Sequence, residues 1–484
     1  MATAEASDAR SPLERSLAIV TEVKAGEGLT AVLLTLNVFL LLTAYYVIKP
    51  VREGLILAME GGAEKKSYIS AAIAVTLLFA VPAYSNVANK VAKHKLVVGV
   101  TLFFAAHLLV FWVLSHIPPV EKELGLVFFT WVGVFNMMVV AQFWGFANDL
   151  YTQEQGKRLF AMVGIGASFG SAVGAYVTKF LKDTLGLGVY QLLLVAGGLL
   201  ALSAFITHVV HRREEGNRAA KEEAKAAEKE GKAAEAAEIA RAKQSPEGGF
   251  TLVLHHRYLM YLAAFMFVFT IVDTNGEYIL SVLVEERAAE RAAEQGLEDA
   301  DAKAAFAKGY IAGYYGSFYL WVNLIGLFIQ TFLVSRIVKL GGLKLAFIVY
   351  PLIALTSSLN LILIPGLFGA DRLSVFRPGK TAENATDYSL NNTVRNMLWL
   401  PTTTEMKYKA KQAVDTFFVR MGDVASAGIV FFFGSRLAWP VRNFSIVNVV
   451  LVAVWLLLSI GILRENARLA RLAEEKKERA SAAT

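Results

Sequence analysis

The amino-acid sequence predicts an all-α polytopic membrane protein, with twelve transmembrane helices arranged as two six-helix halves. Three observations support this prediction. The 484-residue chain is 55% hydrophobic and 18% charged, whereas a soluble protein has about 25% charged residues. Several apolar runs, such as "AVLLTLNVFLLLTAYYV" and "VVLVAVWLLLSIGIL" with their flanks, reach the roughly 18 residues that span a bilayer. A long polar segment in the middle divides these runs into two sets.

The expected spans are separated by short loops, except between the sixth and the seventh. There the segment "HRREEGNRAAKEEAKAAEKEGKAAEAAEIARAKQSPEGG" is rich in Ala, Glu and Lys, which predicts a solvated and partly helical linker. Six spans, a charged linker and six more spans form the layout of the major facilitator superfamily. The expected spans are 29–56, 67–88, 96–115, 125–148, 158–181, 188–211, 255–283, 309–333, 343–365, 386–404, 412–435 and 443–464.

These spans define the predicted domains. An N-terminal segment (1–28) precedes the first half (29–211), the linker (212–250) precedes the second half (251–464), and a basic tail (465–484) follows. The loops after spans 2, 4, 8 and 10 carry clustered basic residues, such as Lys407, Lys409 and Lys411. Basic loops mark the cytoplasmic side, so we expect both termini in the cytoplasm and the chain in a bacterial inner membrane.

Composition and motifs exclude several classes of chemistry. The chain has no cysteine, so disulfides and thiolate chemistry are excluded. There is no P-loop motif and no catalytic triad, and we expect neither an enzyme nor a bound cofactor or metal. The net charge of +7 is explained by basic cytoplasmic loops, and we expect no nucleic-acid partner. Gly166, Gly170 and Gly174 recur every four residues, which predicts a face for close helix packing.

Charged residues within the spans are the candidate functional residues. A charge at the centre of a span costs about 2.5–3.5 kcal/mol, and such residues usually face a cavity or a partner. Span 10 is so polar that neighbouring helices must shelter it, which favours a place beside water. The candidates are Lys49, Arg52 and Glu53 in span 1, Asp149 at the end of span 4, Asp273 and Glu277 in span 7, and Arg395 in span 10.

Structural explanations of these charges remain open at this point. Pro50 could end a shorter first helix, so that Lys49 and Arg52 extend to the headgroups. Asp149 could mark the end of span 4 and pair with Arg158 or Lys157. In a central cavity, the cations would suit phosphate or carboxylate, and Asp149 and Asp273 could balance them or couple to protons.

Three segments carry a family resemblance. "FWGFAND" followed by "GKRLFAMVGIGAS", the stretch "VRNMLWLPTTTEMKYKAKQAVDTFFVRMGDVASAG" and the first span "NVFLLLTAYYVIKPVRE" resemble the ATP/ADP translocases, the nucleotide transporters of plastids and intracellular bacteria. The resemblance extends over all twelve spans at low identity. It implies an antiporter that exchanges nucleotides by alternating access at a charged central cavity.

The resemblance also implies roles for individual residues. The family's lysine in the first span corresponds to Arg52, with Lys49 beside it, and its acidic residue after FWGFAN corresponds to Asp149. The acidic residue of span 7 corresponds to Asp273, and the basic residue of span 10 to Arg395. These five residues are the expected substrate-binding residues. The segment "IKPVRE" departs from the family's cation-acid-Thr-Lys-acid pattern, which leaves open a substrate other than ATP and ADP.

The expected partners are a nucleotide or another phosphorylated small molecule and the lipid bilayer, with a monomer as the expected oligomeric state. Two alternatives remain. One is a proton-coupled carrier of another small anionic solute, with Asp149 or Asp273 as the relay. The other is a membrane scaffold or sensor that does not transport and binds a partner through its charged linker and tail.

Overall fold

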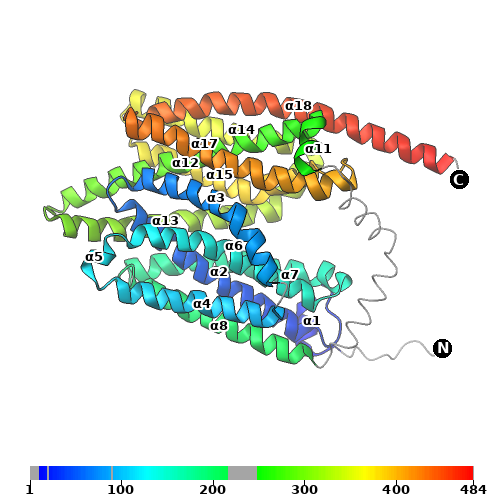
Figure 1. The fold of residues 1–484 in the computed structure, drawn as a ribbon, viewed down its shortest axis with the longest axis horizontal. Helices are drawn as coiled ribbons and strands as arrows, with labels where there is room; N and C mark the ends of the chain where they lie inside the picture. The colour runs from blue at the N-terminus through cyan, green and yellow to red at the C-terminus, as the bar shows by residue number, and fades with distance from the viewer. Residues whose placement is uncertain (1–9, 19–20, 89–90, 216–247, 483–484) are drawn as a thin grey trace. The chain divides into compact units, whose positions relative to one another are not determined.

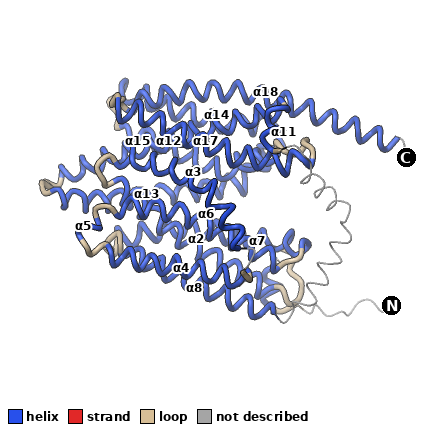
Figure 2. Tube along the Cα trace, in the orientation of Figure 1, coloured by secondary structure: helices blue, strands red, loops and turns tan. Residues whose placement is uncertain are grey.

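The computed structural model describes residues 10–18, 21–88, 91–215 and 248–482, and all regular structure within these ranges is helical (Figure 1; Figure 2). Nine helices there are long and apolar enough to cross a membrane, and the one assigned to Ala300–Phe368 contains two successive spans. Eleven of the twelve predicted spans lie mainly on helices, and the tenth (386–404) is helical up to Met397, which confirms the all-α membrane fold. The predicted linker is described only at its two ends, because residues 216–247 lie outside the described ranges.

The helices that correspond to the predicted spans follow one another with short connections, except between the sixth and the seventh. They are α2 (Gly28–Leu57), α3 (Gly62–Ala88), α4 (Lys93–Leu114), α6 (Leu124–Leu150), α7 (Gln153–Asp183), α8 (Gln191–Glu215), α12 (Arg257–Glu294), α13 (Ala300–Phe328), α14 (Val334–Phe368), α15 (Arg372–Thr386) with α16 (Asn392–Met397), α17 (Val419–Ile429) and α18 (Val441–Ala482). Shorter helices are α1 (Pro12–Leu17), α5 (Pro118–Glu121) and α11 (Gly249–His255). Five π-helical segments are η1 (Ile329–Leu333), η2 (Asp387–Asn391), η3 (Met406–Ala410), η4 (Ala413–Phe418) and η5 (Val430–Arg436).

The chain divides into two compact units. Unit 1 contains residues 1–55, 80–231 and 308–320, and unit 2 contains residues 56–79, 232–307 and 321–484. The units differ from the continuous halves expected from the sequence in two segments, because part of α3 groups with unit 2 and part of α13 with unit 1.

In unit 1, α7 packs against α2 with almost no space between the backbones. A Cβ atom added to Gly170 would lie 2.4 Å from the carbonyl oxygen of Phe39, and one added to Gly174 would lie 2.4 Å from that of Thr43. Gly166 meets the carbonyl oxygen of Thr35 in the same way, at 2.6 Å. The predicted close-packing face is therefore confirmed, and its partner is the backbone of α2.

In unit 2, the core is built from aromatic side chains of α12, α14 and α18. Trp455 packs against Phe265, Phe269 and Tyr350, with ring centroids 5.3–5.8 Å apart. All four rings are buried. Aromatic pairs at such distances add about 0.5–1.5 kcal/mol to the energy of their burial, so this cluster holds α12 in place for the charged residues that it carries.

Helix α2 continues through Pro50 to Leu57, within one residue of the expected end of the first span, so the alternative of a helix shortened at Pro50 is wrong. One predicted boundary is corrected by the structure. The helix of span 10 begins at Arg372, fourteen residues before its predicted start, because Asp371 caps it: the Asp371 side chain accepts a hydrogen bond from the N–H of Ser374.

Candidate functional site

Two cations of unit 1 lie on one face of α2. Lys49 and Arg52 are three residues apart, a spacing that places side chains next to each other on a helix. Lys49 is 8% exposed, and its ammonium lies 3.9 Å from the ring centre of Tyr319 and 5.5 Å from that of Tyr46. Cation–π contacts of this kind partly replace the water that a buried ammonium loses. Lys49 is therefore held inside the unit instead of extending to the headgroups.

Arg52 is held by an acidic neighbour and a ring. Its guanidinium forms an ion pair with Glu53, with the Nε donating to Oε1 at 3.1 Å, and lies 4.5 Å from the ring centre of Phe129 on α6. The Glu53 side chain is fully buried. The Glu53 carboxylate offsets the charge of Arg52, and Lys49 places a second ammonium on the same face of α2.

Asp149 lies at the other end of α6 from Phe129, the ring beside Arg52. It is exposed in the last turn of α6. The ion pairs of Arg158 join it to Glu27 and Glu154, so Arg158 is not the partner that the sequence suggested for Asp149.

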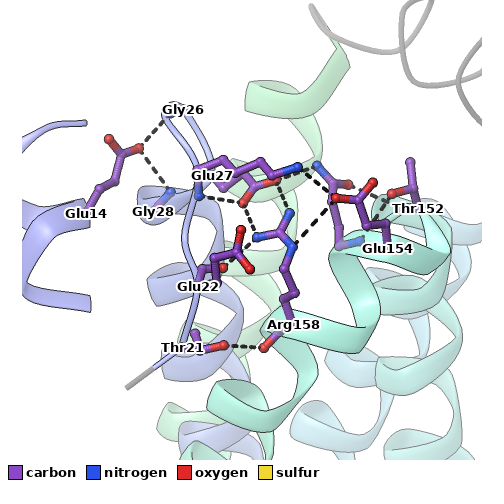
Figure 3. A network of polar contacts seen from close by, with 11 residues as sticks. Glu14, Thr21, Glu22, Gly26, Glu27, Gly28, Thr152, Glu154 and Arg158 are labelled. Carbon is purple, nitrogen blue, oxygen red and sulfur yellow. Dashed lines mark hydrogen bonds and ion pairs between the residues drawn. The ribbon is translucent and has the colours of Figure 1, made fainter. Parts of the chain in front are cut away.

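The N-terminal segment caps the first spanning helix. Ser11 and Glu14 cap α1 through reciprocal hydrogen bonds. The buried Glu14 carboxylate also accepts hydrogen bonds from the backbone N–H groups of Gly26, at 2.7 Å, and Gly28, at 3.3 Å (Figure 3). A carboxylate at a helix start satisfies free N–H groups and complements the helix dipole. Glu14 therefore fixes the beginning of α2.

A second pair joins α2 to α7. Arg158 donates two hydrogen bonds to the Glu27 carboxylate, at 3.0 and 3.1 Å, and Figure 3 shows the two side chains facing each other. Gln155, which also takes part in capping α7, donates to Glu27 at 3.1 Å. We call Glu14, Glu27 and Arg158 the N-terminal clasp.

Acidification is expected to open the N-terminal clasp. The backbone N–H of Ser11 holds the pKa of Glu14 below its usual value of 4.5, against the effect of burial and with help from Gly28 and Gly26. Burial would raise the pKa of Glu27, but its hydrogen bonds to Arg158, Lys24 and Gln155 outweigh that effect and lower it. A carboxyl with a lowered pKa stabilises the fold above its usual pKa, and this stabilisation is lost as the pH falls through the lowered value.

Hydrogen exchange of residues 26–30, corrected for the intrinsic rate, measures this opening. Protection is expected to be constant from pH 7 to pH 5 and to fall below about pH 4. Glu14→Gln should reduce protection already at pH 7. Glu294→Gln is the control, since it removes an exposed pair with Arg291 that has no part in the clasp. Equal protection at pH 3 and pH 7 would show that the clasp does not titrate.

In unit 2, three carboxylates surround a fully buried lysine. Lys380 of α15 has 0% of its surface exposed, and its ammonium lies 2.8 Å from Asp273, 3.5 Å from Glu277 and 3.4 Å from Glu383. Gly276 leaves room for this ammonium, since a Cβ atom there would lie 3.1 Å from it. We call Lys380, Asp273, Glu277 and Glu383 the Lys380 cluster.

Further polar groups surround this cluster. Asn384 donates to Glu277 at 3.0 Å, and the ammonium of Lys66 on α3 lies 4.0 Å from the same carboxylate. Such partners offset the large cost of burying charge. The Lys380 cluster is therefore an extended network that joins α12, α15 and the part of α3 in unit 2.

Arg395 lies in α16, the short helix that follows α15 and the π-helical segment η2. Its guanidinium is 3.9 Å from Asp387 and 5.3 Å from the ring centre of Phe269. Asp387 opens the π-helical segment η2, and Asn391 at its end donates to the same carboxylate at 2.7 Å. Single π-helical turns occur frequently at functional sites. The structure thus brings Asp273 and Arg395 into one unit and Lys49, Arg52 and Asp149 into the other.

Sequence reasoning missed Lys380, Glu383 and Asp387. All three precede or begin the stretch expected as span 10, in a segment too polar to resemble a membrane helix. Their spacing was the available signal, because positions 380, 383, 387, 391 and 395 recur every three or four residues and define one helix face.

Membrane-spanning helices with buried charges in both units define a membrane transporter. Residues 30–378 match the Major Facilitator Superfamily, and the chain belongs to this family. No curated protein matches the sequence significantly.

Solved structures with the same fold are transporters of low sequence similarity. One is the peptide transporter POT in complex with sulfate, with a TM-score of 0.56 and 14% identity over 96% of this chain and 99% of that chain. Another is a bacterial homologue of the iron transporter ferroportin in its inward-facing state, with a TM-score of 0.57 and 13% identity over 90% of this chain and 98% of that chain. These similarities show that the chain shares their fold.

Proposed function

We propose that this chain is an antiporter that exchanges nucleotides of the ATP and ADP type by alternating access. The observation that carries the proposal is the pair of cations on one face of α2, Lys49 and Arg52, both held inside unit 1. A phosphate chain has several anionic oxygens, which suit a lysine and an arginine one helical turn apart. The resemblance of three segments to the ATP/ADP translocases gives the substrate class to test first.

The remaining roles follow from the charges. Arg395 would provide a second contact to the anionic substrate, and Asp149 and Asp273 would supply counter-charge when no substrate is bound. The energy would come from the exchanged gradient. We place the protein in a bacterial inner membrane with both termini in the cytoplasm, because its basic loops and tail share one predicted side. A monomer remains the expected oligomeric state.

Uptake into proteoliposomes tests this proposal. Radiolabelled ATP is offered to vesicles that contain the protein and are preloaded with ADP, beside vesicles without internal nucleotide. We expect uptake that requires internal ADP. Equal uptake in both vesicles would contradict exchange, and no uptake by folded, inserted protein would contradict the substrate. A panel of other phosphorylated or carboxylated solutes would then identify the substrate class.

A second candidate function is a proton-coupled carrier of another small anionic solute. The Lys380 cluster favours it, because three carboxylates around one lysine leave an excess of groups able to take up a proton. This candidate predicts uptake that follows an imposed pH gradient without any internal counter-substrate. Membership in a transporter family favours both carriers over a scaffold or sensor.

A further inference from the structure

A groove in unit 2 lies away from the charged residues discussed above. It has a volume of about 560 Å³ and lies between α14 and the last part of α18, two helices that run side by side (Figure 1; Figure 2). Its charged lining is mostly basic, with Lys344, Arg464, Arg468 and Arg471 against one acidic residue, Glu475. The groove therefore has the charge of an anion-binding site.

The sequence places this groove at the edge of the bilayer. On α18 the apolar run "VVLVAVWLLLSIGIL" ends at Leu463, and Arg464 is the first charge after it. On α14 the backbone departs from helical geometry at Gly342, where φ is 60°, and a long apolar run begins just beyond Lys344. Both walls thus change from basic to apolar at the same level, as expected where headgroups meet acyl chains.

The lining combines apolar and cationic groups. Ile460 and Leu463 contribute apolar surface at the end nearer the middle of the span. Positions 464, 468 and 471 lie three or four residues apart, so their side chains form one stripe along the helix. A ligand that suits both parts has an anionic head and a hydrocarbon tail.

The four cations that line the groove differ in whether they form an ion pair. Arg468 forms an ion pair with Glu465 at 3.3 Å, and Glu465 also lies 3.8 Å from Arg257. Within the part of the chain that the structure describes, Lys344, Arg464 and Arg471 form no ion pair with a carboxylate. These three exposed cations can therefore engage an external anion without breaking an internal bond.

We propose that the groove binds the headgroup of an anionic phospholipid, with Arg464 and Arg471 on the phosphate and Lys344 on the opposite wall. Arginine can donate two parallel hydrogen bonds to a phosphate. Basic pockets between membrane helices at the cytoplasmic surface bind such headgroups. The proposal is independent of the transported substrate, because none of its residues belongs to the Lys380 cluster or to the cations of α2.

Lipid titration followed by native mass spectrometry tests the proposal. The full-length protein in detergent is titrated with phosphatidylglycerol and, separately, with phosphatidylcholine. We expect phosphatidylglycerol to bind the wild-type protein more tightly. The double variant R464Q/R471Q should bind it about thirtyfold more weakly, which is about 2 kcal/mol for two surface charges. The variant R464K/R471K keeps the positive charge and should lose less affinity for phosphatidylglycerol than the glutamine variant.

The control removes the same charge from the other end of the same helix. R436Q/R442Q replaces two exposed arginines that lie at or just before the start of α18, and its binding should stay within about twofold of wild type. Equal losses in the two glutamine variants would overturn the proposal, since they would indicate general attraction to positive charge. Displacement of the lipid by equimolar inorganic phosphate would also overturn it, in favour of a site for free phosphate.

Discussion

Replacing Lys380 by methionine is expected to destabilise the protein strongly. The substitution removes a cation that lies within 3.5 Å of three carboxylates in unit 2 and leaves Asp273, Glu277 and Glu383 close together. Removing one partner of a buried ion pair costs about 3–5 kcal/mol, because the remaining charge has no compensation. Lys66 lies 4.0 Å from Glu277 and can offset only part of this loss.

Thermal unfolding of protein in lipid nanodiscs measures the effect. The midpoint of Lys380→Met should fall well below that of wild type. The double variant K380M/E383Q should recover part of the loss, since it also removes one carboxylate. Arg372→Met is the matched control, because it removes a positive charge from the exposed start of the same helix. A midpoint of Lys380→Met equal to that of the control would mean that the carboxylates do not depend on this lysine.

The second large effect is expected in transport. Lys49→Gln should reduce uptake of an anionic substrate by about tenfold to a hundredfold, because a hydrogen bond to a charged group contributes about 1.5–3 kcal/mol. The free energy of unfolding should change less than the rate of uptake, since Tyr46 and Tyr319 remain packed around the shorter side chain. Initial rates at limiting substrate, with the amount of inserted protein determined in parallel, measure the effect.

Arg52 needs a paired substitution, because its loss alone would leave the buried Glu53 charge without its partner. The variant R52Q/E53Q removes both charges and should lower uptake to a similar extent. Lys49→Arg should retain part of the activity, and Lys179→Gln, which removes an exposed lysine from α7, should retain all of it. Wild-type uptake by both Lys49→Gln and R52Q/E53Q would refute the role of these cations in substrate binding.

Features that depend on local pattern were predictable from the sequence. Apolar runs indicated each spanning helix, since a bilayer requires a minimum apolar length. The spacing of Gly166, Gly170 and Gly174 indicated close packing, because only the absence of a side chain permits backbone contact. Asp273 was predictable as a charged residue inside a spanning helix from its place near the middle of a span, and its side chain is half-buried.

Features that depend on tertiary contacts were not predictable. The segment 372–385 is too polar to insert alone, and its buried charges have tertiary partners. Lys380 and Asn384 contact Asp273 and Glu277 on α12, and Glu383 pairs with Lys380. The partner of Arg158 could not be inferred, because Glu27 comes from a helix start 131 residues away.

The contact between α2 and α7 has a consequence for the movements that accompany transport. With three carbonyl groups of α2 touching glycines of α7, α2 cannot turn about its own axis without moving its neighbour. Gating by rotation of this helix alone is therefore sterically excluded, and Lys49 and Arg52 change their surroundings only when both helices move together. A pair of spin labels on the outer faces of α2 and α7 would thus supply an internal reference distance, against which displacements elsewhere in the cycle could be calibrated.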